Sequence, residues 1–154
     1  MWLRRRRLPR IEGTQQLEEL DAAVDIIRDR WTVPPIYAQT EHDFYFAQGF
    51  VHAQDRLWQM TFNRRLVAGR LAEVLGSRAV QIDRWIRALG LRWVAEQETG
   101  QLAALQRAVL TAYAAGVNVF LVSSRRYGQL PIEFTLLRYR PKPWKPSTRS
   151  PGPR

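Results

Sequence analysis

The sequence predicts a mainly α-helical chain of the α+β class, in which a short N-terminal β-hairpin precedes about three long helices. Three observations support this fold class. Apolar residues recur at helical spacing in three zones between residues 40 and 122. Partly alternating β-branched residues stand before these zones, between residues 23 and 38. Prolines recur from residue 141 to residue 153, and proline is excluded from helix interiors.

The hairpin is predicted from residues 23–30, whose β-branched residues and partial alternation are typical of a strand. The run from Trp31 to Pro35 ends this strand, and residues 36–38 can pair back with it. Because Pro35 has no N–H group, the second strand must lie at an edge or start after this residue.

The first long helix is predicted to begin after Thr40, whose hydroxyl can accept a hydrogen bond from the N–H of Asp43. Its apolar face is strongly aromatic, and the helix runs to about Val67. Residues 71–75 add a short helical turn, and Gly76 is placed to end it.

A second helical zone spans about residues 79–98, and Gly90 predicts a bend within it. Its predicted buried side consists of Val80, Trp85, Ile86, Leu89, Trp93 and Val94. A third zone spans about residues 102–122, where Gly116 within the apolar face indicates a close approach of another helix or of a ligand to the backbone, and tight helix packing is the favoured interpretation. Residues 134–139 are predicted to be extended or irregular.

Length and composition limit the possible functions. The chain of 154 residues suffices for one domain, with residues 11–146 as its folded region. The absence of cysteine excludes thiolate catalysis and cysteine-based metal sites, and the chain has only two histidines. The net charge of +10 is concentrated at the two ends, a weaker indication of nucleic-acid binding than a basic stripe. Residues 1–10 are predicted to be a disordered basic arm and residues 147–154 a disordered tail.

The basic arm also bears on localisation. Arg4, Arg5, Arg6 and Arg7 can make weak, salt-sensitive contact with an anionic membrane surface. No apolar segment of the length that a signal peptide needs follows these arginines. No run of about 18 apolar residues predicts a membrane span either. We therefore expect the chain as written to stay in the cytoplasm.

Candidate chemistry is sparse. His52 and Asp55 lie three residues apart on one helix and could act as base and orienting group, although a surface histidine is the simpler interpretation. His42 is expected to support the helix start. Ser77 follows a helix-ending glycine, which favours a capping role over self-processing at this junction. We therefore predict no catalytic and no metal-binding residue, and leave the substrate-binding residues open.

A set of charged residues is embedded in the apolar helices, and Arg56 in particular could form a bidentate pair with Glu73 or Asp83. We expect these charges to fix helix register. The set consists of Asp55, Arg56, Arg64, Arg65, Glu73, Asp83 and Arg87.

The same residues lie within motifs that point to a family. The run from Phe46 to Met60 reads FAQGFVHAQDRLWQM, and it is followed in order by 63-NRR-65, 69-GRLAE-73, 75-LG-76 and 112-AYAAGVN-118. Shorter matches precede and follow these motifs, so that about residues 8–146 are covered. This pattern resembles the penicillin acylase (penicillin amidase) family of N-terminal-nucleophile hydrolases.

The resemblance implies an αββα sandwich made from a precursor that cuts itself into a helical α chain and a larger β chain. The N-terminal serine of the β chain is then the nucleophile, and linear acyl amides such as β-lactam side chains or acyl-homoserine lactones are the substrates. Complete members are typically exported, and many bind calcium through ligands that have no counterpart in this sequence.

The matched motifs belong to the first part of an α chain, so we expect a truncated α-chain portion that is inactive alone and needs a β chain. Phe44, Phe50, Trp58, Trp85 and Trp93 cannot all be covered within 154 residues, so we also expect exposed apolar surface and self-association. A non-catalytic interaction module or gene remnant is the alternative, and a basic nucleic-acid or membrane-surface binder is a third, less favoured interpretation.

Several residues depart from the family pattern, which suggests that selective constraint on this sequence is relaxed. Thr32 stands where the family has glycine, and Pro35 where it has histidine. Ala103-Ala104 replaces an Asp-Pro helix start, and Arg138 occupies a position where glycine is common.

Overall fold

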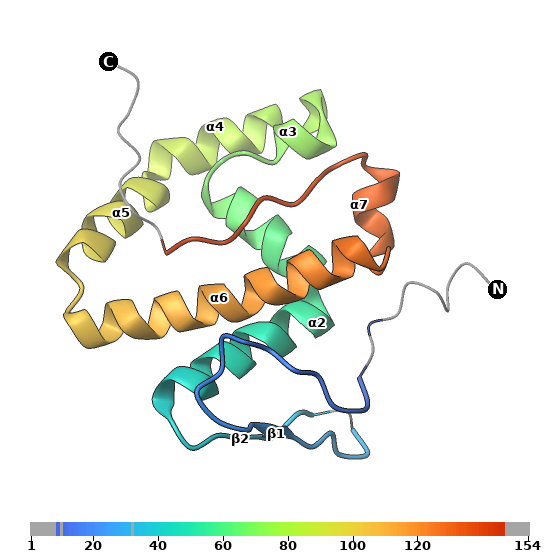
Figure 1. Cartoon of the computed structure of the whole chain (residues 1–154). Helices are drawn as coiled ribbons and strands as arrows, with labels where there is room; N and C mark the ends of the chain where they lie inside the picture. Colours follow the sequence, from blue (N-terminus) through green and yellow to red (C-terminus); the bar gives the residue numbers. More distant parts are fainter. Residues whose placement is uncertain (1–8, 10, 32, 147–154) are drawn as a thin grey trace.

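A computed structural model describes residues 9, 11–31 and 33–146 (Figure 1). Two long helices, α2 and α6, cross at the centre, with the N-terminal segment and hairpin on one side and α3, α4 and α5 on the other. The prediction of a mainly helical α+β chain is confirmed. The predictions made for the basic arm, for Thr32 and for the tail from residue 147 lie outside the described residues.

The hairpin forms as predicted but is shorter. Strand β1 (Asp25–Ile26) pairs antiparallel with β2 (Ile36–Tyr37), with Ile26 opposite Ile36. Two further backbone hydrogen bonds continue the ladder toward the turn, from the N–H of Ile27 and from that of Asp29. Pro34 and Pro35 offer no N–H group to that ladder, which explains why regular pairing covers so few residues.

Helix α2 (Glu41–Val67) begins and ends where the sequence predicts. The N–H of Asp43 donates to the Thr40 hydroxyl at 3.0 Å. The helix is kinked at Arg56, whose backbone leaves helical geometry at φ −141° and ψ 27°. The kink divides α2 into a first half that carries the aromatic face and a second half that leads to the corner at Gly69.

The core lies where α2 crosses α6 (Ala104–Arg126). A Cβ on Gly116 would lie 1.9 Å from the carbonyl oxygen of Phe46, and one on Gly49 would lie 2.1 Å from that of Tyr113. Both helices therefore use glycine at the crossing, and the close approach predicted from Gly116 is confirmed. The crossing buries a cluster that consists of Phe50, Ala53, Leu57, Val117, Phe120, Leu121 and Phe134.

Helix α6 is also long and apolar enough to span a membrane by length and composition. Core helices of soluble proteins pass the same test. Here Val117, Phe120 and Leu121 are buried against α2, whereas Leu105, Leu110 and Val122 are exposed, so contact with α2 accounts for part of the apolar character of α6.

The second helical zone is divided as Gly90 predicts. Short helix α3 (Ala72–Leu75) and a 3₁₀ turn, η1 (Ser77–Ala79), precede α4 (Val80–Leu89), and α5 (Leu91–Gln101) follows. Gly76 and Gly90, with φ of 75° and 69°, end α3 and α4. The backbone there is one that glycine adopts without steric cost.

The prediction that residues 134–139 are extended or irregular is wrong for residues 134–136 and confirmed for residues 137–139, which form a turn and an irregular segment. Helix α7 (Ile132–Leu136) covers the start of this segment, immediately after Pro131. The side chain of Phe134 is buried against Trp58, and its ring stacks with Tyr139. Burial of this one aromatic side chain stabilises a single helical turn that the sequence pattern is too short to reveal.

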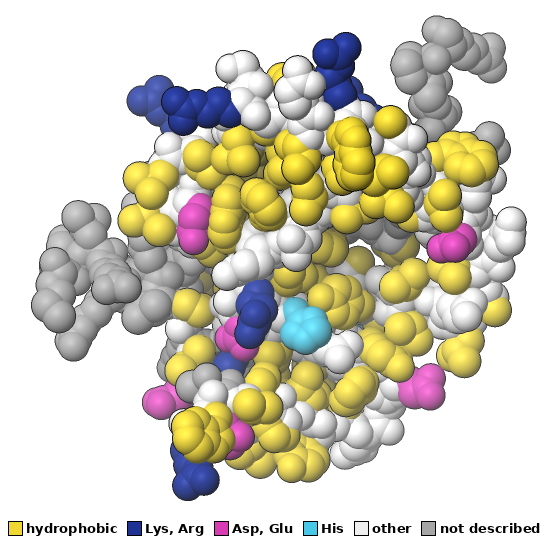
Figure 2. Space-filling model, turned by 180° about the vertical axis from the view of Figure 1, so that it is seen from behind, with side chains coloured by type: hydrophobic (Ala, Val, Ile, Leu, Met, Phe, Trp, Pro, Cys, Tyr) yellow, Lys and Arg dark blue, Asp and Glu magenta, His cyan; other side chains and the backbone are white. Residues whose placement is uncertain are grey.

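The predicted buried side of residues 79–98 is also wrong. Trp85 and Trp93 are 68% and 66% exposed, and Val80, Leu89 and Val94 are exposed as well. The expectation that not all aromatic faces can be covered is confirmed, because Phe50 is buried whereas Phe44, Trp85 and Trp93 are exposed. Figure 2 shows hydrophobic side chains in a band across the half of the molecule that holds α3, α4 and α5.

Candidate functional site

The corner between α2 and α4 is fixed by the polar side of α4. The carboxylate of Asp83 accepts hydrogen bonds from the N–H groups of Leu71 and Ala72 at 2.8 and 2.7 Å. Arg87 Nε donates to the carbonyl oxygen of Gly69 at 2.8 Å. Because Asp83 is buried, these bonds hold α4 in one orientation against the α2–α3 corner.

A second cluster joins the end of α2 to α3. Glu73 accepts from Arg65 at 2.7 Å and from Arg70 at 2.5 Å, and Arg65 also donates to the Tyr139 hydroxyl at 2.6 Å. The guanidinium of Arg70, followed by that of Arg65, lowers the pKa of Glu73 from 4.5 to about 2. Burial alone would lower the pKa of Arg65, but its bonds to Glu73 and Tyr139 raise it above the ordinary value.

The predicted pairing of Arg56 with Glu73 or Asp83 is wrong. Glu73 is bound by Arg65 and Arg70, and the oxygens of Asp83 accept backbone N–H groups. Arg56 lies exposed at the kink of α2.

The segment 139–146, called the strap below, runs over α2 and α6. The side-chain amide of Asn118 donates to the carbonyl of Trp144 at 2.8 Å and accepts from its N–H at 2.7 Å. Arg64 donates to the carbonyls of Lys142 and Pro143, and its guanidinium lies 4.6 Å from the centre of the Trp144 ring. The strap thus ties the two long helices together. This role was not predicted from the sequence, although the polar Asn118 within the apolar pattern of α6 is a signal of it.

The N-terminal segment is held on α2 by the carboxylate of Asp43. Asp43 is fully buried, and its carboxylate accepts from the N–H groups of Asp21 and Ala22 at 2.9 and 3.1 Å. Burial opposes the charge, but these bonds, with those from Thr40 and His42, keep the pKa of Asp43 below its ordinary value. Helix α2 thereby fixes the N-terminal segment.

Farther along α2, Arg28 forms an ion pair with Asp55 at 2.9 Å and donates to the side chain of Gln54 at 2.6 Å. Asp55, one of the charges singled out in the sequence, therefore holds the hairpin. Between the N-terminal segment and the first half of α2 lies an open cleft of about 600 Å³, with Phe46, Ala47 and Phe50 on its α2 side.

His52 and Asp55 are not brought together as a catalytic pair. The Nδ1 atom of His52 lies 3.0 Å from the Tyr113 hydroxyl, across the α2–α6 crossing, while Asp55 is bound by Arg28. Ser77 is exposed as the first residue of η1, and the residues that precede η1 and α4 as N-caps are Gly76 and Ala79, so the predicted capping role of Ser77 is wrong. The described positions of His52, Asp55 and Ser77 do not assemble a nucleophile with a base.

His42 lies near two carboxylates, those of Asp21 and Asp43, at 3.6 and 3.3 Å. Possible ligand atoms of the three residues lie within 4.8 Å of one another. The oxygens of Asp43 already accept backbone hydrogen bonds, and calcium prefers a shell of oxygen ligands over imidazole. The group does not fit calcium, and the contact of His42 with Asp43 agrees with its expected support of the helix start.

Comparisons with known proteins identify the family to which this chain belongs. The family model for penicillin amidase matches residues 23–149. Penicillin acylase 2 proenzyme of a Pseudomonas species is 45% identical over 139 residues, which are 90% of this chain and 18% of that protein. Acyl-homoserine lactone acylase QuiP of Pseudomonas aeruginosa is 40% identical over 90% of this chain and 16% of its own length. The chain thus spans less than a fifth of these relatives.

Among solved structures, a thermostable penicillin G acylase from Alcaligenes faecalis superposes with a TM-score of 0.73 at 30% identity. The match covers 81% of this chain and 67% of the solved one. Most of this chain therefore has the same fold as part of that acylase.

Proposed function

Because the chain belongs to the penicillin amidase family, we propose that it forms part of the α chain of an amidohydrolase that cleaves linear acyl amides. The observation that carries this proposal is the run from Phe46 to Met60, which lies within α2 and crosses α6 where Gly49 of α2 and Gly116 of α6 allow close approach. The two relatives are named for penicillin and for acyl-homoserine lactones, and both names denote removal of an acyl group from an amide nitrogen.

In this proposal the chain supplies the scaffold, and a β chain supplies the chemistry. Neither His52 nor Ser77 has the neighbours that a base or a nucleophile needs. The charged groups of the corner and the strap hold helices in register, a positioning role for the assembled enzyme. Of the charges singled out in the sequence, all but the exposed Arg56 are proposed to act in this way, namely Asp55, Arg64, Arg65, Glu73, Asp83 and Arg87.

The proposal is tested by a chimera. The 139 matched residues of the penicillin acylase 2 proenzyme are replaced by those of this chain, and hydrolysis of a chromogenic acyl anilide and of an acyl-homoserine lactone is measured. We expect self-processing and turnover from the chimera and none from the isolated chain. A folded chimera that neither processes nor hydrolyses would refute the proposal. Turnover by the isolated chain that disappears in Ser77→Ala would also refute it.

A non-catalytic interaction module remains the second candidate, and the exposed apolar side of α4 favours it. The same chimera separates the two functions. An acylase α-chain portion should support self-processing of the chimera, whereas an interaction module that is no longer part of an acylase should not. The predicted membrane-surface contact of Arg4–Arg7 and the cytoplasmic location stay predictions.

A further inference from the structure

A strongly acidic segment follows the basic arm directly. Residues 1–10 carry five arginines and no acid, whereas residues 11–27 carry five acids and no basic residue. The five acids are Glu12, Glu18, Glu19, Asp21 and Asp25. Opposite charges this close in the chain attract one another, most strongly at low ionic strength.

The acidic segment lines the open cleft on the first half of α2. The volume of the cleft, about 600 Å³, is within the range of about 300–1,000 Å³ that is typical of ligand sites. Glu12, Asp21 and Asp25 are among its lining residues. Ile11 and Ile26, which are 53% and 38% exposed, add apolar surface to it. The cleft therefore suits a group that is both cationic and apolar.

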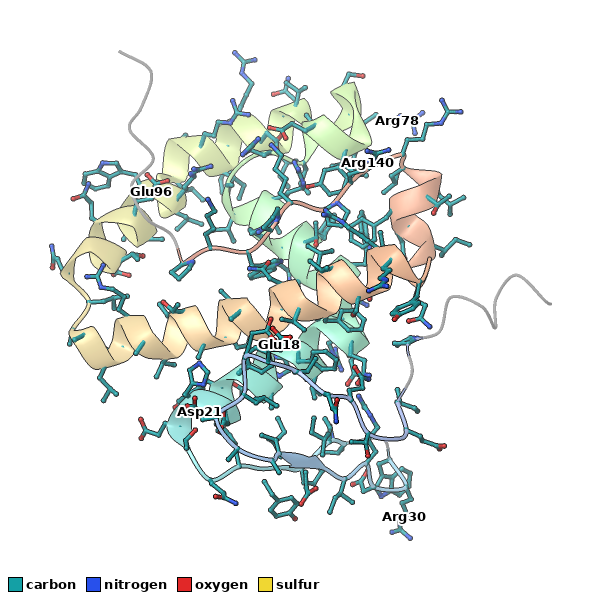
Figure 3. All side chains as sticks on the ribbon, viewed as in Figure 1. Glu18, Asp21, Arg30, Arg78, Glu96 and Arg140 are labelled. Atoms are coloured by element: carbon teal, nitrogen blue, oxygen red, sulfur yellow. The ribbon has the colours of Figure 1, made fainter. Side chains whose placement is uncertain are left out.

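The carboxylates of this segment are open to a cationic group. Within residues 9, 11–31 and 33–146, the only ion pair of the five acids is that of Asp21 with His42 at 3.6 Å. Arg28, which also lines the cleft, is paired with Asp55 of α2. Figure 3 shows Glu18 and Asp21 on the N-terminal segment, on the same side of α6 as the hairpin.

The basic arm is attached at the edge of the cleft. Ile11 lines the cleft, and residues 2–7 precede it by only four to nine positions. An extended chain spans about 3.3 Å per residue, so Trp2 can reach points up to about 30 Å from Ile11. A short link of this kind also keeps the effective concentration of the arm at the cleft high.

We propose that residues 2–7 of the basic arm bind in the cleft of the same chain. Trp2 and Leu3 contact its apolar surface, and the guanidinium groups of Arg4–Arg7 pair with Glu12 and Asp25. The arm thereby covers the opening between the N-terminal segment and α2 and excludes other occupants from it. This inference is independent of the proposed function, because it concerns contacts within this chain alone.

The test places a nitroxide spin label in the cleft and records the indole N–H signals of the tryptophans by NMR. The chain has no cysteine, so Gln15→Cys, at an exposed position that lines the cleft, gives a single labelling site. A nitroxide broadens the signals of nearby protons, and Trp2→Phe identifies the signal of Trp2. Trp85 and Trp93 are internal references, because α4 and α5 lie on the other side of the α2–α6 crossing (Figure 1).

We expect the Trp2 signal to be broadened at least about fivefold more than the reference signals at low salt, and much less in 1 M salt, where charges are screened within about 3 Å. The double variant Glu12→Gln/Asp25→Asn should lose most of this broadening. The matched control Glu98→Gln, which removes an exposed acid of α5, should keep it.

The circular dichroism of the double variant should match the wild type, because Glu12 and Asp25 are exposed. A second variant tests the same charges from the other side. Replacement of Arg4–Arg7 by glutamine leaves the cleft unchanged and should also abolish the broadening of Trp2.

A Trp2 signal no broader than those of Trp85 and Trp93 overturns the inference, and it supports the disorder that is predicted for the arm from its sequence. Broadening that both charge variants retain overturns it as well. A mixture of spin-labelled chains with isotope-labelled chains that carry no nitroxide distinguishes a second copy, because broadening of Trp2 in that mixture places the arm in the cleft of another chain and overturns the proposal. A Trp2 signal that the label does not affect, but that is lost when phosphatidylserine vesicles are added, assigns the arm to a membrane surface instead.

Discussion

Replacement of Gly116 by alanine should destabilise the chain by about 1–3 kcal/mol, although alanine is the better helix former by about 1 kcal/mol. The added Cβ would lie 1.9 Å from the carbonyl oxygen of Phe46 and 2.9 Å from the nitrogen of Phe50, and real Cβ contacts essentially never fall below 3.0 Å. Helices α2 and α6 must therefore move apart by about 1 Å at the crossing, a gap that costs a quarter to a half of each contact energy there.

The magnitude follows from the side chains that this gap affects. A large core side chain makes about 50 contacts of about 0.15 kcal/mol each, so partial loss around one such residue amounts to about 2–4 kcal/mol. Phe120 is the nearest example, because it packs edge-to-face on Phe50 across the same crossing. Subtraction of the helix-propensity gain of about 1 kcal/mol leaves the expected net loss.

Urea unfolding followed by circular dichroism measures this loss, with Gly100→Ala as the control. Gly100 lies in α5 with no atom within 4 Å of an added Cβ, so its replacement should raise the free energy of unfolding by up to about 1 kcal/mol. If Gly116→Ala proves as stable as the wild type, the close crossing does not exist in solution and the reasoning is wrong.

Three further predictions concern single residues. The free energy of unfolding should fall as the pH drops from 4.5 toward 2, because the pKa of Glu73 is lowered on folding. The loss is about 1 kcal/mol because this side chain is partly exposed. A series of urea unfolding curves at several pH values should show a weaker pH dependence for Glu73→Gln than for the wild type. Arg138→Gly should raise the melting temperature and increase the free energy of unfolding by about 1 kcal/mol, because the backbone φ of 50° at this exposed position favours glycine. An unchanged melting temperature would contradict this. Asp83→Ala should cost about 1–3 kcal/mol and increase amide exchange at the start of α3, whereas the exposed Arg84→Ala should change neither.

The long helices could be predicted from the sequence because their signals are local. Thr40 caps the start of α2, and Gly76 and Gly90 end α3 and α4 through the backbone that glycine alone adopts freely. The glycine expected at position 138 is likewise explained by the positive φ of Arg138. In each case the determining residue lies within or beside the element that it shapes.

The site could not be predicted in the same way, because its contacts are non-local. The orientation of α4 depends on N–H groups that are more than ten residues earlier in the chain and are left unpaired by the preceding turn. A periodic apolar pattern identifies the apolar side of a helix but not whether this chain or another one covers it. For this reason the sequence pattern predicts a buried Trp85, and it pairs Arg56 with Glu73 or Asp83, which are bound by other arginines and by backbone N–H groups respectively.

The strap has a consequence for a chain that is cut. Arg64 and its carbonyl partners Lys142 and Pro143 are separated by 78 and 79 residues, and Asn118 holds Trp144 from the opposite helix. A protease that cleaves between α5 and α6, near Leu102, would therefore leave two fragments with the complete α2–α6 crossing between them. We expect such fragments to elute together under native conditions and to separate only in denaturant, so that a nicked preparation would pass for intact protein until it is denatured.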